Sequence, residues 1–143
     1  EEVAADWMED RQKMMTILQE EAELNEIVQM VGMDALSPTD RLKMEAARSI
    51  REDFLHQNSF HEIDTYTPLR KQYLMMKLVL AFYEKSVDAL NKGADMNALI
   101  AMPVREKIGR YKYTTDADIE SEYKNVEEEL DKEVAAAFGK EDF

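Results

Sequence analysis

The chain has few of the residues that interrupt regular structure or carry thiol chemistry. Its 143 residues include four glycines, three prolines and no cysteine. The lack of cysteine excludes disulfides, thiolate zinc sites and cysteine nucleophiles, and favours an intracellular, cytoplasmic setting. So few glycines and prolines leave room for long uninterrupted helices.

Positive charge is scarce and long apolar runs are missing. Asp and Glu number 31 against 18 Lys and Arg, which gives a net charge of -13. This charge repels nucleic-acid phosphates and anionic lipid headgroups, so we expect neither nucleic-acid binding nor direct membrane contact. No apolar run approaches the roughly 20 residues that cross a bilayer. Because the chain opens at Glu1 without a methionine, we expect a fragment of a longer protein.

Apolar residues recur at spacings of three and four, which is the period of an α-helix. We therefore predict an all-α fold, a helical bundle of about five to six helices that forms a single domain over residues 1–143. A chain of this length can bury about two thirds of its unfolded surface. Ten methionines could line an adaptable peptide groove, but Met14, Met75 and Met76 fall in apolar helical stretches, so core packing is the preferred interpretation.

The first two helices have clear boundary signals. Gly32 ends a predicted helix from about Asp6 to Val31, and Ser37 followed by Pro38 reads as the cap and first turn of the next. The inward stripe of the first helix is predicted to comprise Met14, Ile17, Leu18, Leu24, Ile27, Val28 and Val31. That of the second is predicted to comprise Leu42, Ala46, Ile50 and Phe54.

Thr67 and Pro68 mark the start of a third helix, which is apolar almost all round and should be central. It should stop near Gly93, and two short helices should follow, separated at Met102–Pro103. Thr115 is predicted to cap a last helix. Its narrow apolar stripe consists of Ile119, Tyr123, Val126, Leu130, Val134 and Phe138. Such a stripe packs along one partner helix, in this chain or in another subunit, and Glu127–Glu129 should face solvent.

Patterns that would carry catalysis or metal binding are weak. Glycines 32, 93, 109 and 139 do not fit the spacing of a phosphate-binding P-loop, so no catalytic residue is assigned. The nearest approach to a di-metal bundle motif is Asp53-x-x-His56, which occurs once. His56 and His61 are too few for a convincing metal site, and none is expected.

The segment Gln57–Pro68 places two aromatic residues, Phe60 and Tyr66, six positions apart in a polar loop. Loop aromatics of this kind can stack on a nucleotide base. They can equally anchor the loop to the core. The spacing alone leaves both interpretations open.

Two longer segments, Leu24–Ser37 and Phe54–Phe60, resemble the C-terminal domain of rotary ATPase catalytic subunits. The stretch Gln57–Tyr66 with its following proline looks specifically like the catalytic alpha chain of archaeal and bacterial V-type (A-type) ATP synthases. The resemblance continues through Lys71–Tyr73, Leu78–Tyr83, Met102–Arg105 and the charged last helix, and covers the chain from about Arg11 onward.

The resemblance implies that the complete alpha chain makes or hydrolyses ATP and couples this to ion transport. ATP or ADP and Mg would be bound at its interface with the neighbouring B subunit. Phe60 matches the aromatic that stacks on adenine, and Tyr66 the second aromatic of that pocket. His56 stands where relatives should carry a glutamine. The isolated fragment should bind no nucleotide or metal, because the P-loop belongs to an upstream domain.

The resemblance also implies a turn that faces the central-stalk rotor. It comprises Asp34, Ala35, Leu36, Ser37, Pro38, Thr39 and Asp40. Ala35, Pro38 and Thr39 dilute its acidity, which favours steric contact over charge. Such a domain would be peripheral to the cell membrane as part of the complex. The main alternative is a freestanding acidic adaptor that binds a basic helix through the last-helix stripe, and a carboxylate-rich metal bundle is a distant second.

Overall fold

The computed structural model of the chain describes residues 2–55 and 67–138, and over these ranges it contains helices and no strand. The long helices are α1 (Glu2–Val31), α2 (Pro38–Ser49), α3 (Thr67–Asn91) and α6 (Ile119–Ala136), with the short α4 (Met96–Ile100) and α5 (Val104–Arg110) before the last. The predicted all-α fold is confirmed.

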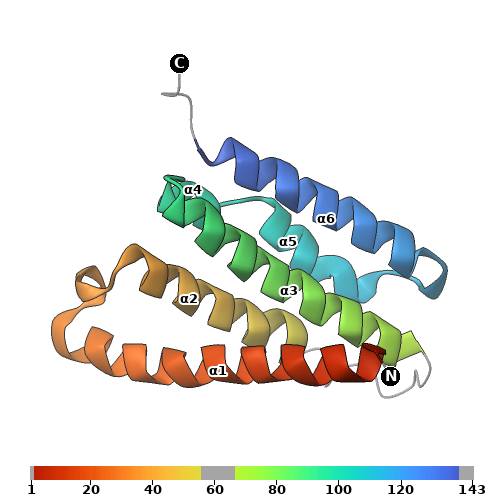
Figure 1. The fold of residues 1–143 in the computed structure, drawn as a ribbon, viewed down its shortest axis with the longest axis horizontal. Helices are drawn as coiled ribbons and strands as arrows, with labels where there is room; N and C mark the ends of the chain where they lie inside the picture. The colour runs from red at the N-terminus through yellow and green to blue at the C-terminus, as the bar shows by residue number, and fades with distance from the viewer. Residues whose placement is uncertain (1, 56–66, 139–143) are drawn as a thin grey trace.

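Helix α3 runs through the middle of the bundle, with α1 and α2 on one side and α5 and α6 on the other (Figure 1). Its side chains are buried along most of its length, as its apolar sequence predicts. The buried set in α3 comprises Leu74, Met75, Met76, Leu78, Val79, Leu80, Phe82, Ser86 and Ala89. The helix ends at Asn91, and Gly93 follows with a φ of 110°, a conformation that glycine adopts without steric cost. The predicted stop near Gly93 is confirmed.

The second predicted helix is present, but its last part has a different form. Ser37 caps α2 by accepting a hydrogen bond from the Asp40 amide at 3.1 Å, which confirms the predicted cap. Beyond Ser49 the chain continues without a break as a π-helix, η2 (Ile50–Leu55). Leu42, Ala46 and Ile50 are buried as predicted, whereas the Phe54 side chain lies outside the described residues.

The last predicted helix begins later than its sequence suggested. Thr115 precedes the 3-10 turn η5 (Asp116–Asp118), and α6 begins only at Ile119. The Thr115 hydroxyl donates to the Asp118 carboxylate at 3.1 Å instead of capping an α-helical turn. The prediction of Thr115 as the cap of α6 is therefore wrong, because a threonine hydroxyl can bond to a local acid as readily as to a backbone amide.

The apolar stripe of α6 packs inside this chain. Ile119, Val126 and Leu130 are buried, and the helix lies against α3 and α5. The predicted stripe is thus confirmed, with α3 as its main partner helix. On the opposite side Glu128 is exposed as predicted, whereas Glu129 is half-buried with its Oε1 4.0 Å from Lys107 Nζ.

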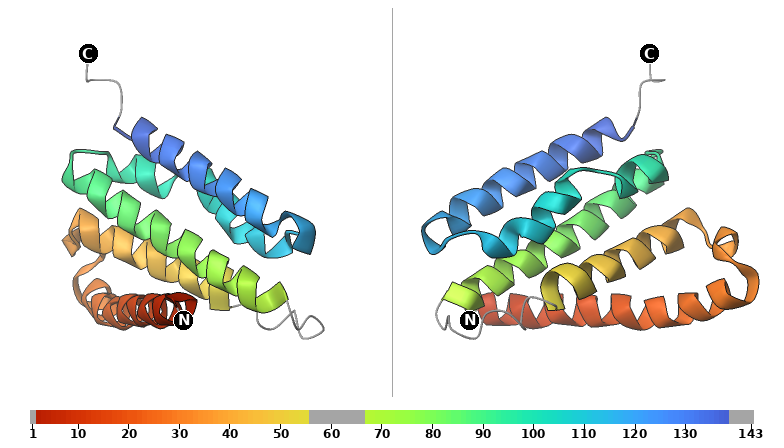
Figure 2. Two further views of the ribbon diagram at one scale, coloured as in Figure 1. Left: turned by 45° about the vertical axis from the view of Figure 1, so that its right-hand side comes forward. Right: turned by 180° about the vertical axis from the view of Figure 1, so that it is seen from behind.

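The first helix is only partly packed, which corrects the stripe predicted for it. Met14, Ile17 and Leu24 are buried, but Ile27 and Val31 are 43% and 64% exposed. Helix α1 has 30 residues and α2 only 12, and the end of α1 lies at the margin of the bundle beside the connecting turn (Figure 2). Apolar residues continue at helical spacing past Leu24, but no described helix covers Ile27 and Val31.

Candidate functional site

The aromatic residues Phe60 and Tyr66, predicted to bind adenine, lie outside the described residues. The structure shows the helices on either side of them. Helix η2 ends at Leu55, part-way along α1, and α3 begins at Thr67, at the end of the bundle opposite the α1–α2 turn (Figure 1).

The predicted rotor-facing turn is described in full. Gly32 has a φ of 94°, and its amide donates to the Val28 carbonyl at 2.8 Å, which closes α1. A 3-10 turn, η1 (Met33–Ala35), follows. Leu36 is buried and anchors the turn, whereas Asp34, Ala35, Ser37 and Pro38 are exposed and Thr39 and Asp40 half-exposed. The turn is therefore anchored at Leu36, and the residues on either side of Leu36 face solvent.

Apolar side chains surround this turn, and two of them, Ile27 and Val31, were predicted to lie in the core. The exposed set at the end of α1 comprises Ile27, Met30, Val31 and Met33, of which Met30 is 81% exposed. Their exposure could have been anticipated from the Gly32 stop, since side chains in the last turn of a long helix have few neighbours to cover them. Exposed apolar groups that lie together are typical of contact surfaces.

The turn and the end of η2 are the two ends of one helical rod, Pro38–Leu55. At the helical rise of 1.5 Å per residue this rod is about 25 Å long. Four consecutive inward positions hold it to the core: Leu42, Ala46, Ala47 and Ile50 are each fully buried. A single packed element therefore runs from the predicted rotor-facing turn to Leu55, where the first described range ends.

Arg105 of α5 fixes the rod just before the π-helix begins. Its Nη1 donates to Glu45 Oε1 at 2.9 Å and to the Ile100 carbonyl at 3.0 Å. Its Nη2 donates to the Glu45 carbonyl at 3.2 Å and to Ser49 Oγ at 2.9 Å. All four Nη hydrogens are thus used, and only a guanidinium supplies such a fixed fork of donors.

The guanidinium of Arg105 also lies over the Phe82 ring, 4.7 Å from its centroid, and its buried Nε has no hydrogen-bond partner among the described residues. One side chain therefore joins α2, α3, α4 and α5. The sequence showed this arginine only as part of a resembling segment and predicted no role for it, because its partners in α2 are 56 and 60 residues away.

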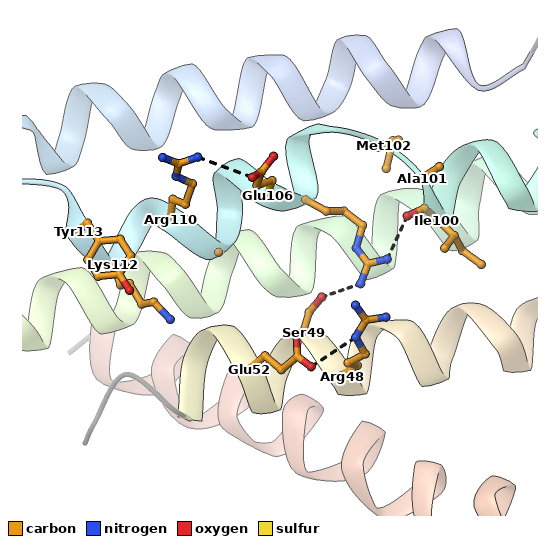
Figure 3. Close-up of a pocket in the computed structure, with 12 residues that line it drawn as sticks. Arg48, Ser49, Glu52, Ile100, Ala101, Met102, Glu106, Arg110, Lys112 and Tyr113 are labelled. Atoms are coloured by element: carbon orange, nitrogen blue, oxygen red, sulfur yellow. Dashed lines mark hydrogen bonds and ion pairs between the residues drawn. The ribbon is translucent and has the colours of Figure 1, made fainter. Parts of the chain in front are cut away.

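A pocket of about 460 Å³ opens beside this junction (Figure 3). Arg48 and Glu52 of the rod pair at 3.4 Å on one wall, and Glu106 and Arg110 of α5 pair at 3.6 Å on another. Lys112 completes the basic lining. These exposed pairs satisfy their charges locally and leave the pocket without a built ligand site.

The π-helix is also tied to α1, since Arg51 forms an ion pair with the mostly buried carboxylate of Glu21. A second contact lies nearer the start of α1, where Asp6 and Asp10 face Lys77 of α3. The Lys77 Nζ atom is 2.5 Å from Asp6 and 2.8 Å from Asp10. Although partial burial acts to lower it, these two carboxylates raise the pKa of Lys77 above its ordinary value. Ion pairs therefore attach α1 to both the π-helix and α3.

Within residues 2–55 and 67–138, no three His, Asp or Glu side chains gather as a metal-binding group. In the same part of the chain, none of the helices is long and apolar enough to cross a membrane.

Comparison with known proteins identifies the family of this chain. Residues 1–100 match the family described as the C-terminal domain of V and A type ATP synthase. The chain is 55% identical over 141 residues to the V-type ATP synthase alpha chain of Acetivibrio thermocellus, which covers 99% of this chain and 24% of that protein.

Two other V-type ATP synthase alpha chains match this chain with similar identity and coverage. The protein of Clostridioides difficile is 55% identical over 125 residues, or 87% of this chain and 21% of the relative. The alpha chain of Thermoanaerobacter pseudethanolicus is 51% identical over 135 residues, which is 94% of this chain and 22% of the relative. The chain thus spans less than a quarter of the length of these relatives. It belongs to the family of C-terminal domains of V and A type ATP synthases.

Proposed function

We propose that this chain is one helical domain of the catalytic alpha chain of a V/A-type rotary ATPase, and that it links nucleotide binding to rotor contact. The observation that carries the proposal is the packed rod Pro38–Leu55. One end adjoins the exposed turn at Asp34–Asp40, and the other leads into the segment with Phe60 and Tyr66.

The nucleotide end of the proposal rests on aromatic stacking. Phe60 stacks on the adenine of ATP or ADP, and Tyr66 forms a second wall of the pocket. The phosphates and Mg are held upstream in the longer alpha chain and by the neighbouring B subunit. This chain contributes no catalytic residue, so its role is to bind the base and to transmit movement.

The rotor end rests on exposed apolar surface. Met30, Val31 and Met33 lie at the turn with exposed side chains. The central-stalk rotor contacts this tip sterically. When the upstream domain closes on nucleotide, the bundle moves as one lever, because the rod is held from Leu42 to Ile50 by buried side chains and by Arg105. The complex then couples ATP synthesis or hydrolysis to ion transport, with this domain on the cytoplasmic side and peripheral to the membrane.

The alternative of a freestanding adaptor loses its main support. It required the stripe of α6 to be available for a partner helix, but Val126 and Leu130 are 1% and 0% exposed against this chain's own core. Family membership also favours a part of a longer subunit over an independent adaptor.

The test is nucleotide affinity in the assembled complex that carries Phe60→Ala. Base stacking is worth about 1–3 kcal/mol, so the variant should bind ATP roughly ten- to a hundredfold more weakly. Phe60→Trp keeps an aromatic face and should retain most of the affinity, whereas Phe60→Leu should behave like the alanine variant. Unchanged affinity in Phe60→Ala would remove the adenine-pocket assignment.

A further inference from the structure

The start of α1 is held to α3 by one lysine that contacts two acids. Lys77 of α3 pairs with Asp6 and Asp10, which lie one helical turn apart on α1. Asp10 is buried, with 4% of its surface exposed, and Lys77 is mostly buried. The Tyr73 hydroxyl also donates to Asp6, at 2.7 Å. We call Asp6, Asp10, Tyr73 and Lys77 the α1 anchor.

Aromatic and ionic contacts extend the anchor to the last helix. The Trp7 ring of α1 stacks on the Tyr73 ring, with the two centroids 6.1 Å apart. The guanidinium of Arg70 lies 5.6 Å from the centroid of the same Tyr73 ring. Arg70 also forms two hydrogen bonds with the Glu120 carboxylate, at 2.6 and 3.0 Å. The start of α1 is therefore connected through α3 to the start of α6.

The burial of the anchor indicates that it serves position more than stability. Buried ion pairs add little stability over apolar packing, because taking the charges out of water costs about as much as their attraction returns. A buried charge that loses its partner is nevertheless costly, so a buried pair resists displacement. Lys13 and Glu84 also join α1 to α3, at 3.1 Å, but both side chains are about half exposed. Exposed pairs of that kind constrain helices only weakly.

The anchor determines how far along α3 the first helix lies. If α1 moved by one turn toward its own start, Met14 would take the place of Asp10, and Asp6 would leave Lys77. If it moved by one turn the other way, Asp10 would take the place of Met14, which is buried in the apolar core. One-turn shifts are a known way for packed helices to change register. Each shift separates Lys77 from one of its present partners, so Lys77 favours a single register.

We propose that Lys77 is a positioning residue of the rotary mechanism, which fixes the register of α1 on α3 so that movement of the upstream domain reaches the whole bundle. This rests on the proposed function, in which the rest of the alpha chain precedes α1. The start of α1 lies at the end of the bundle opposite the rotor-facing turn (Figure 1). Movement that enters there is passed to α3 and the turn because α1 does not slide.

The first experiment replaces the charges of the anchor by neutral side chains in the full-length alpha chain. The neutral variant carries Asp6→Asn, Asp10→Leu and Lys77→Met. In the assembled complex we expect ATP hydrolysis to continue while the number of ions transported per ATP falls at least about twofold. The control variant, Lys13→Met with Glu84→Gln, removes the exposed pair and should keep the parent ratio. An unchanged ratio in the neutral variant would overturn the proposal, as would an equal decrease in the control variant.

The second experiment distinguishes positioning from ordinary stabilisation. Because the neutral variant replaces all three charges together, it leaves no buried charge unpaired. The thermal unfolding midpoint of the 143-residue chain should therefore stay within about 3 °C of the parent value. Lys77→Met alone leaves Asp10 buried without its cation and should lower the midpoint by more than this. A clearly lower midpoint in the neutral variant would mean that the charges serve stability, and would overturn the proposal.

The third experiment measures the register by the distance between two spin labels. The chain has no cysteine, so the labels are attached through Met15→Cys on α1 and Asn125→Cys on α6, which are both exposed positions. The parent should give one narrow distance distribution. The neutral variant should give additional distances displaced by up to about 5 Å, the rise of one helical turn. The parent distribution in the neutral variant would refute the fixed register.

Nucleotide affinity separates failure of the anchor from failure of the proposed function. If Phe60→Ala weakens ATP binding while the neutral variant keeps the parent ratio of ions to ATP, the role of Lys77 is overturned and the proposed function stands. If Phe60→Ala binds ATP as tightly as the parent while the spin labels report a second register in the neutral variant, the adenine pocket is overturned and Lys77 still fixes α1.

Discussion

Arg105 and Ser49 are 56 residues apart in sequence, yet Arg105 Nη2 donates to Ser49 Oγ at 2.9 Å. This bond lies at the last residue of α2, immediately before the π-helix. The point at which α2 passes into the π-helix is therefore held by a side chain from α5.

Arg105→Met should lower the free energy of unfolding by about 2–4 kcal/mol, because hydrogen bonds from a charged donor are lost and Glu45 is left with one cation fewer. Arg105→Lys should recover part of this, since an ammonium cannot reproduce the fork. Urea unfolding measures the free energy of unfolding of both variants against the parent chain. Arg110→Met is the control: Arg110 is 72% exposed, so this change should cost less than about 0.5 kcal/mol. Similar losses at both arginines would contradict the junction.

Leu130→Ala and Val31→Ala test the correction made to the stripe of α1. Leu130 is fully buried, so its truncation should cost about 2–5 kcal/mol. Val31 is 64% exposed, and its truncation should cost less than about 0.5 kcal/mol, although both residues are apolar and helical. Denaturant midpoints of the two variants give the comparison. A large loss for Val31→Ala would mean that the end of α1 is packed after all.

Ser37→Ala should destabilise the chain by about 0.5–2 kcal/mol, because the Asp40 amide loses the acceptor that begins α2. Ser37→Asp keeps an acceptor at the same position and should stay close to the parent chain. Thermal unfolding followed by circular dichroism measures the difference. If both variants lost the same stability, the cap would not be the cause.

Glu133→Gln should stabilise the chain near neutral pH by about 0.2–0.5 kcal/mol, the usual cost of a like-charge pair one turn apart. Burial and the neighbouring Glu129 raise the pKa of Glu133, and the Val104 amide, which donates to Glu133 Oε1 at 2.9 Å, opposes this. Glutamine can still accept that bond.

The pH dependence of this effect follows from its sign. A raised folded pKa means that the folded chain takes up the proton first, so the parent gains stability as pH falls through that pKa toward the ordinary value of 4.5. The advantage of Glu133→Gln should therefore be present at pH 7, shrink as pH falls through the raised pKa of Glu133, and be lost below about pH 4.5. Urea unfolding at both pH values, with Glu128→Gln as an exposed control, tests this. A stability difference between Glu133→Gln and the parent chain that stays the same at both pH values would contradict the raised pKa of Glu133.

Local chemistry was sufficient for much of the architecture. The Ser37 cap, the stops at Gly32 and Gly93 and the apolar period of α3 each depend on residues within a turn of one another, so the sequence predicted them correctly. The cap of α4 by Asp95, which accepts from the Ala98 amide at 2.9 Å, was a signal of the same kind and was missed. Thr115 shows the limit of such signals, since its hydroxyl can accept from a backbone amide or donate to a nearby carboxylate, and here it donates to Asp118.

Spacing along the chain could show that α1 and α6 are amphipathic, but not which stripe would be covered. That depended on where other helices lie: α6 packs against α3 with Val126 and Leu130 buried, whereas Val31 and Met15 stay 64% and 54% exposed. Arg105 illustrates the same division. Its charge and reach are properties of the residue, but its four acceptors come from α2 and the end of α4, because a guanidinium is satisfied only where folding brings distant oxygens together.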